Sequence, residues 1–256
     1  MADRKLLRLS ATVLFISALV FEVASLLHPG GGANTDQAAF TVYANSSSWT
    51  AIHLGQFVGT AVFLAGLLVL FFALNVSEGT PRWLGFFGAI SAGVALALAG
   101  HLVANPTADH ISAISAGVAL ALAGVVYAVD GVALEQATDA WVSAPAAEQA
   151  ARFASAEAIR WLEWGTRSYQ SFMSGLALVL LATTIVWTAR ITRPIGYIMG
   201  LNGLASIVQG WVIGTEGFSV TNGVTYDISG LATIVWMIWL LIVAWRMKES
   251  VQAAPA

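Results

Sequence analysis

Apolar segments long enough to cross a membrane recur along this chain. Leu6–Leu27 and Ala51–Val76 are the first two, and a helical crossing takes about 20 mainly apolar residues. Only 10% of the 256 residues are charged and 58% are hydrophobic, whereas a soluble domain has about a quarter charged. So few charges cannot cover a chain of this length in water. The sequence therefore predicts an all-α, polytopic transmembrane helix bundle and excludes an ordinary soluble enzyme.

Charge and cysteine content exclude further classes of protein. The net charge is −3 and the sequence has no basic block, so nucleic acid is not an expected partner. The absence of cysteine excludes disulfides, iron–sulfur clusters, thiolate zinc sites and thiol redox chemistry. The first apolar segment is too long for the core of a signal peptide, so we interpret it as an uncleaved first span.

Polar or proline-containing connections separate the apolar segments, which together predict one integral membrane domain over residues 1–256. The predicted spans are 6–28, 51–76, 84–134, 151–189, 195–214 and 228–246.

The segment 84–134 contains an internal repeat that makes the number of crossings ambiguous. Ala89–Gly100 and Ala113–Gly124 both read AISAGVALALAG. If each copy belongs to its own span, the chain crosses seven times. If 84–134 forms one crossing plus an inserted helical hairpin, it crosses six times.

The distribution of basic residues favours six crossings, because basic residues gather on the cytoplasmic side of membrane proteins. Arg4, Lys5 and Arg8 place the N-terminus in the cytoplasm. With six crossings four further basic residues also lie inside, and with seven they lie outside: Arg190, Arg193, Arg246 and Lys248. We therefore predict a multi-pass protein of the inner (cytoplasmic) membrane with both termini in the cytoplasm.

Ionisable residues within the spans indicate where a functional site lies, because such residues are costly in lipid and face a bundle interior or a wet cavity. In the six-crossing topology they all fall in the outer half of the bilayer. This pattern predicts an outward-facing polar site above an apolar floor. The candidate ligand- or ion-binding residues are Glu22, His53, Asp130, Glu157, Arg160, Glu163 and Arg167.

Residues 157–167 have the spacing of a charged stripe on one helix. Glu157, Arg160, Glu163 and Arg167 follow one another at three- or four-residue intervals, so neighbouring charges alternate in sign and can pair. One interpretation is a structural ladder of ion pairs. The other is that one carboxylate stays free as a proton acceptor or cation ligand.

The other candidates depend on partners from other helices. Glu22 has no basic residue within four positions, so it needs Arg160, Arg167 or a bound cation, or else a proton. Asp130 lies either inside the bundle or at the interface beside Gly131, where it would cap a turn.

The four histidines offer weaker signals. His53 is either a hydrogen-bonded interfacial side chain or a general base or metal ligand, and a metal could then be held by His53, Glu157 and Glu163. His28 precedes a Pro-Gly-Gly turn and is expected to end a helix. His101 and His110, with Asp109 between them, match no metal motif.

Two further patterns concern helix packing. Asn202 and Gln209 lie seven residues apart on one helical face and predict hydrogen bonds between helices. Gly196-x-x-x-Gly200 allows another helix to approach closely. No nucleotide-binding, nucleophile-elbow or zinc-protease motif is present, so the cofactor is left open.

Several strings resemble a group of uncharacterised multi-pass membrane proteins of actinobacteria over about residues 40–240. They are Trp49-x-x-x-His53, Asp130-Gly-Val-Ala-Leu134, the nine residues EAIRWLEWG at 157–165 and GTEGFS at 214–219. Such proteins usually have one span where this chain carries the repeat twice, which again favours six crossings. The resemblance implies no activity and no catalytic residues.

Three functions follow as hypotheses. The first is an outward-facing site that binds or transports a small ligand, cation or proton. The second is a membrane enzyme acting on a lipid or isoprenoid through a carboxylate and His53, with or without a metal. The third is a non-catalytic subunit of a larger membrane complex. Whether the chain is an enzyme is open, and its expected partners are the lipid bilayer and either further copies of itself or other membrane subunits.

Overall fold

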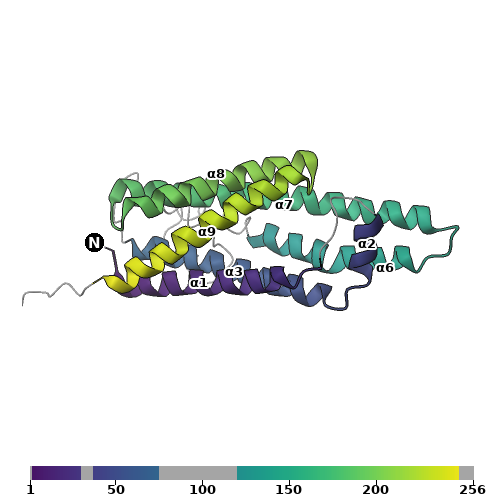
Figure 1. Cartoon of the computed structure of the whole chain (residues 1–256), viewed down its shortest axis with the longest axis horizontal. Helices are drawn as coiled ribbons and strands as arrows, with labels where there is room; N and C mark the ends of the chain where they lie inside the picture. The colour runs from purple at the N-terminus through teal and green to yellow at the C-terminus, as the bar shows by residue number, and fades with distance from the viewer. Residues whose placement is uncertain (1, 30–36, 75–119, 248–256) are drawn as a thin grey trace, which may run out of the picture.

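The computed structural model describes residues 2–29, 37–74 and 120–247, and all regular structure in these ranges is helical (Figure 1). Within these ranges six helices are long and apolar enough to cross a membrane. They are α1 (Arg4–Leu26), α3 (Trp49–Ala73), Leu120–Val142, α7 (Gln149–Thr188), α8 (Arg193–Glu216) and α9 (Val220–Arg246). The third contains a π-helical turn, η1 (Val129–Leu134), followed by α6 (Glu135–Val142), and a short helix, α2 (Gln37–Ala44), precedes α3. The all-α class and a polytopic bundle are thus confirmed.

The predicted hairpin within 84–134 lies mostly outside the described residues. The first copy of the repeat, most of the second copy and the three residues His101, Asp109 and His110 also lie outside the described residues.

The two ends of the described chain meet at one end of the bundle, here called the terminal end. The backbone N–H of Asp3 donates to the carbonyl of Ala73 at 2.7 Å, so α1 begins where α3 ends. The Arg8 guanidinium donates to the carbonyls of Ala244 and Trp245 at 3.1 and 3.2 Å, so α9 ends there too. Both ends of the described chain therefore lie at the same end of the bundle, as the six-crossing prediction requires.

The half of the bundle near the terminal end is a closely packed apolar core. Side chains from α1, α3, α7, α8 and α9 interdigitate there, and the largest are fully buried. They include Leu7, Leu14, Leu67, Leu70, Leu181, Ile185, Ile195 and Trp236. The outer surface of the same helices is also apolar, with Leu9, Leu19, Leu204 and Leu231 each at least half exposed, as expected of helices that face lipid.

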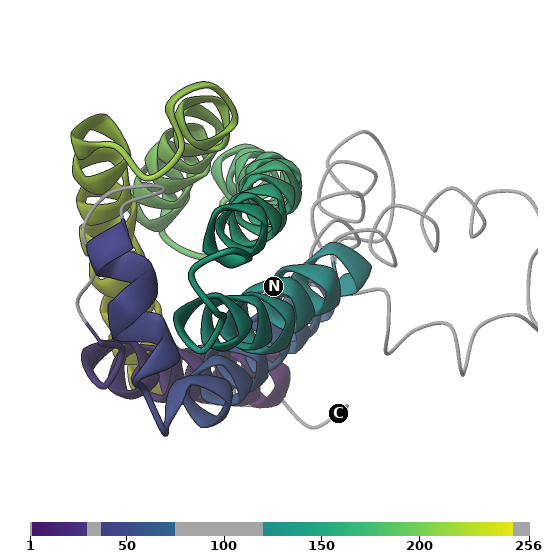
Figure 2. The ribbon, with the colours of Figure 1, turned by 90° about the vertical axis from the view of Figure 1, so that its right-hand side faces the viewer.

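The opposite end, here called the distal end, is built differently. With 40 residues α7 is about 60 Å long, twice the thickness of a hydrocarbon core. Its first turns, with α6 beside them, extend beyond α1, α3, α8 and α9 (Figure 1). In the end-on view α2 lies across this end of the bundle (Figure 2). A small aromatic core joins α2, α6 and the start of α7 through Phe40, Tyr43, Trp141 and Phe153.

The long helices α7 and α8 are held together by a seam of glycines. A Cβ built on Gly175 would lie against the carbonyl oxygen of Gly203, and one on Gly203 against that of Gly175. Gly210 meets the backbone of Ser168 in the same way, and Gly196 meets α7 near Ala182. The predicted close approach at Gly196-x-x-x-Gly200 therefore occurs within one chain, where small residues let backbones approach.

Alanine substitutions on α7 should lower stability at a glycine of the seam and not at a glycine outside it. Gly175→Ala should lower the thermal unfolding midpoint in detergent, because its methyl group meets backbone that cannot move aside and overpacking costs about 1–3 kcal/mol. Gly165→Ala is the matched control, since its Cβ would contact nothing within 4 Å. Alanine favours a helix over glycine by about 1 kcal/mol, so the control should keep or raise the midpoint. Equal midpoints for the two variants would contradict the seam.

Candidate functional site

The charged stripe predicted on residues 157–167 forms along α7 from its second member, Arg160, onward. Glu163 is fully buried and accepts hydrogen bonds from two arginines of the same helix. Arg160 contacts one carboxylate oxygen through Nη1, and Arg167 contacts the other through Nε at 3.2 Å. These are the i,i+3 and i,i+4 neighbours that the spacing predicts.

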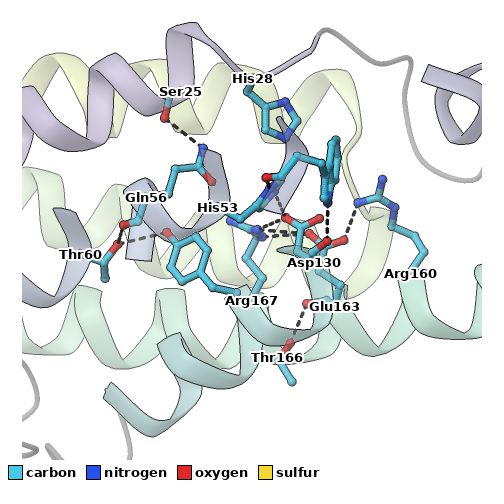
Figure 3. Close-up of polar contacts among 12 residues, drawn as sticks. Ser25, His28, His53, Gln56, Thr60, Asp130, Arg160, Glu163, Thr166 and Arg167 are labelled. Carbon is cyan, nitrogen blue, oxygen red and sulfur yellow. Dashed lines mark hydrogen bonds and ion pairs between the residues drawn. The ribbon is translucent and has the colours of Figure 1, made fainter. Parts of the chain in front are cut away.

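Asp130 extends this stripe to a second and third helix (Figure 3). Its Oδ2 atom lies 2.9 Å from Nη2 of Arg167 and 2.9 Å from Nε2 of His53 on α3. The result is a chain of five ionisable side chains, here called the charge cluster: Arg160, Glu163, Arg167, Asp130 and His53. All except Arg167 are at least 95% buried.

The π-helical turn η1 places Asp130 for these contacts. In such a turn carbonyl groups leave the regular helical pattern and become available to other donors. The carbonyl of Asp130 accepts from the indole of Trp49 at 2.6 Å, and that of Gly131 accepts from the hydroxyl of Thr50 at 2.7 Å. Gly131 has no side chain to separate the two helices, and a Cβ there would overlap His53. Asp130 is thus a buried bridging residue and does not cap an exposed turn.

The imidazole ring of His53 lies between Trp49 and Asp130. Nδ1 of His53 lies 2.8 Å from the carbonyl oxygen of Trp49, which can only accept, so Nδ1 carries a proton. Nε2 faces Oδ2 of Asp130 at 2.9 Å, which is ion-pair distance. Within the charge cluster two arginines lie against two carboxylates, and His53 lies against one of these carboxylates.

The guanidinium of Arg160 is enclosed by aromatic rings. Its central carbon lies 4.9 Å from the ring of Tyr43, 5.3 Å from Phe218 and 5.9 Å from Phe40. Its Nε and Nη2 atoms are buried without a hydrogen-bond partner among the described residues. Attraction between the cation and the faces of the rings offsets part of that loss. Burial also raises the pKa of the Tyr43 hydroxyl, which keeps this ring neutral.

A cavity of about 520 Å³ lies beside the charge cluster and within the distal half of the bundle. Arg167 is the cluster member that reaches it most, since its side chain is 23% exposed and those of Asp130 and Glu163 are 5% and 0%. Below Arg167 the walls are neutral and polar. They include Gln56, Thr60, Gln170, Ser171, Ser174, Ser206, Gln209, Asn222 and Tyr226.

Two predicted site residues do not join the charge cluster. Glu157 is half-buried on α7 and forms no ion pair with Arg160, whose Nη1 contacts Glu163 instead. Glu22 is exposed, forms no ion pair among the described residues and lines a separate pocket. Of the predicted partners of Glu22, neither Arg160 nor Arg167 pairs with it, and a bound cation or a proton stays a prediction.

The predicted metal set of His53, Glu157 and Glu163 does not form. Among the described residues no three histidine, aspartate or glutamate side chains are placed to hold a metal ion. The cluster carboxylates are instead occupied by arginines, whose positive charges oppose a cation.

Several site residues carry no clear signal in the sequence. His28, predicted only to end a helix, does follow α1 but also lines the cavity, with its ring centroid 5.1 Å from that of His53. Tyr43 and Phe218 reach the site from α2 and from the α8–α9 turn. The Trp49-x-x-x-His53 spacing was the one available hint, because it puts both rings on one face of α3.

Asn202 and Gln209, the two uncharged polar residues predicted on one face of α8, have different surroundings. The Asn202 side-chain amide lies 2.7 Å from the Ser229 hydroxyl and 2.6 Å from the Thr233 hydroxyl, so the predicted hydrogen bonds to a neighbouring helix are confirmed there. Gln209 lines the cavity instead.

Comparisons of the chain with models of known families, with curated proteins and with solved structures gave no match. The resemblance to actinobacterial membrane proteins therefore stays a prediction, and the site is interpreted from its own geometry.

Breaking the charge cluster should cost far more than breaking a surface pair on the same helix. Arg167→Gln leaves two buried carboxylates short of a partner, and such losses cost about 3–5 kcal/mol. Arg152→Gln is the control, because its pair with Glu148 is more than half exposed and such pairs contribute about 0–1 kcal/mol. Chemical unfolding in detergent measures both. Adding Asp130→Asn to Arg167→Gln should restore part of the stability, and strictly additive losses would argue against direct pairing.

His28 should make the protein less stable in mild acid. Burial lowers the pKa of this imidazole from its ordinary value of 6.5, so the unfolded chain binds the proton more readily than the folded one. Stability from this group is present above about pH 6.5 and is lost as the pH falls through that value. His28→Gln should therefore reduce the drop in the unfolding midpoint between about pH 7.5 and 5.5. An unchanged drop would show that His28 titrates as it does in the unfolded chain.

Proposed function

We propose that this integral membrane protein binds a small ligand in a cavity that opens on the outer face of the membrane. The observation that carries the proposal is the cavity of about 520 Å³ beside a buried charge cluster. Cavities of a few hundred Å³ with a few convergent polar groups are typical ligand sites. A membrane bundle that needed only stability would fill this space with apolar side chains.

The outward orientation rests on the distribution of charge between the two ends. Arg4, Lys5, Arg8 and Arg193 gather at the terminal end, which the positive-inside rule assigns to the cytoplasm. The cavity lies in the other half, and the apolar core closes it from the terminal end. A ligand would therefore enter from the outside.

Binding is favoured over catalysis by the state of the ionisable groups. A general acid or base must reach its substrate, yet the side chains of His53 and Glu163 are 1% and 0% exposed and already paired. The accessible member is Arg167, a group that recognises charge and does not exchange its proton. The same arginine disfavours a metal cation as the ligand.

Cysteine labelling tests the cavity directly, since the chain has no cysteine of its own. Ser171→Cys places a thiol on the cavity wall, and we expect a membrane-impermeant thiol reagent to modify it in intact cells. Thr184→Cys is the matched control on α7, because this position is 0% exposed within the apolar half. It should stay unmodified until the protein is denatured.

The same membrane-impermeant reagent also shows which end of the protein faces the outside of the cell. Met247→Cys at the terminal end should react in inverted vesicles and not in intact cells. A Ser171 thiol that reacts only in inverted vesicles would reverse the proposed orientation. One that reacts from neither side would show that no open cavity exists there.

A further inference from the structure

A second pocket, of about 200 Å³, lies next to the cavity and deeper in the membrane-spanning region. The two share four lining residues from four helices: Phe21, Thr60, Gln209 and Tyr226. Beyond these the second pocket, here called the side pocket, is mainly apolar. Its other lining residues are Ser17, Ala18, Glu22, Gly59, Phe63, Ser229, Gly230, Thr233, Ile234 and Met237.

The side pocket lies where α9 diverges from α1. The two helices meet at the terminal end, where Arg8 bonds to the last carbonyls of α9. From there α9 runs obliquely away from α1 toward α8 (Figures 1 and 2). Ile234, on the wall of the side pocket, is 43% exposed, and Glu22 is exposed as well. The side pocket therefore borders the surface that faces lipid.

Polarity changes along the two adjoining pockets in the same direction as in one leaflet of a bilayer. The positive guanidinium of Arg167 lies at the distal level, neutral polar groups follow, and the side pocket below is lined mainly by apolar groups, with Glu22 at its exposed border. From Tyr226 to Met237 the space follows α9 for about 16 Å, roughly half of a hydrocarbon core. A small hydrophilic solute would leave the apolar part unused.

The positive charge of Arg167 indicates which polar group a ligand would carry. Arg167 uses Nε for Glu163 and Nη2 for Asp130, and its Nη1 forms no hydrogen bond within the described part of the chain. The guanidinium of Arg167 lines the cavity and is its most exposed cluster member, so Nη1 presents a positive charge to which an anion would bind. Hydrogen bonds between arginine and carboxylate or phosphate oxygens are among the strongest in proteins.

We propose that the ligand is a single-chain amphiphile with an anionic headgroup, a carboxylate or a phosphate. The headgroup lies against Arg167 and the aliphatic chain lies in the side pocket between α1 and α9. This inference rests on the proposed function and names the class of ligand that the cavity takes. The ligand reaches the site sideways from the outer leaflet, and its long axis is parallel to the neighbouring lipids.

The test follows a thiol placed in the side pocket. Gly230→Cys suits this purpose because a Cβ at Gly230 contacts nothing within 4 Å, and Gly223→Cys is the matched control on α9, equally open but outside both pockets. In phosphatidylcholine nanodiscs, laurate or dodecyl phosphate should slow modification of the Gly230 thiol by a small reagent and leave the Gly223 thiol unaffected. Dodecanol and dodecyltrimethylammonium share the chain but lack the anion, and should not slow it.

The dependence on Arg167 is measured with the same thiol. A charge-assisted hydrogen bond contributes about 1.5–3 kcal/mol, so Arg167→Gln should raise the concentration of laurate needed for half protection by about tenfold or more. Arg167→Lys keeps the charge and should retain most of the protection. Because the headgroup series is run on the protein with Arg167 intact, the charge preference is tested even if Arg167→Gln fails to fold.

The outcomes separate the two proposals. If Ser171→Cys is labelled from outside but neither anionic amphiphile protects the Gly230 thiol, the cavity stands and the amphiphile is wrong. If Ser171→Cys is not labelled at all, the proposed function itself fails. Equal protection by dodecanol would overturn the role of the anion. Stronger protection by dodecyltrimethylammonium would assign recognition to Glu22 instead of Arg167.

Discussion

The bridge that Arg167 makes between Glu163 and Asp130 is the interaction on which the distal half of the bundle depends. It joins α7 to the π-helical turn η1, and through His53 it reaches α3. None of these charges would be stable alone in a low-dielectric interior. The free energy lost when an ion leaves water is larger than the free energy gained from a single contact. Each is held by at least one opposite charge, so the cluster forms as a unit. That unit fixes one wall of the cavity and leaves one edge of Arg167 facing it.

The two halves of the bundle use different physical means to hold the same helices. Near the terminal end, leucine and isoleucine side chains interdigitate, and α7 approaches α8 backbone to backbone at Gly175 and Gly203. Toward the distal end α9 diverges from α1, and polar contacts and aromatic rings become more frequent, while α7 and α8 stay close at Ser168 and Gly210. The divergence of α9 from α1 opens the side pocket, and the length of α7 carries the charge cluster to the level where α1 ends and α3 begins. A gradient from polar to apolar surface results, with its polar part toward the distal end.

Much of this arrangement could be predicted from residue spacing. The interval between Arg160, Glu163 and Arg167 predicted pairing, because residues three and four apart share a helical face. Asp130 and His53 were selected because ionisable groups in apolar segments need partners, and they were found to be partners of each other and of Arg167. The same rule failed for Glu22 and Glu157. A carboxylate at the edge of a bundle can face outward, and helical spacing does not say which face of α7 is buried.

The sequence by itself determined the class of the protein, because a scarcity of charge over long apolar segments admits only a membrane bundle. Only the tertiary structure decided which of its few ionisable groups meet. The π-helical turn at Asp130, the missing side chain of Gly131 and the aromatic rings around Arg160 come from three separate parts of the chain. Contacts between distant segments depend on how helices cross and rotate. Local spacing fixes the faces of a helix but not its neighbours, so the cavity and its side pocket appear only when the helices are packed.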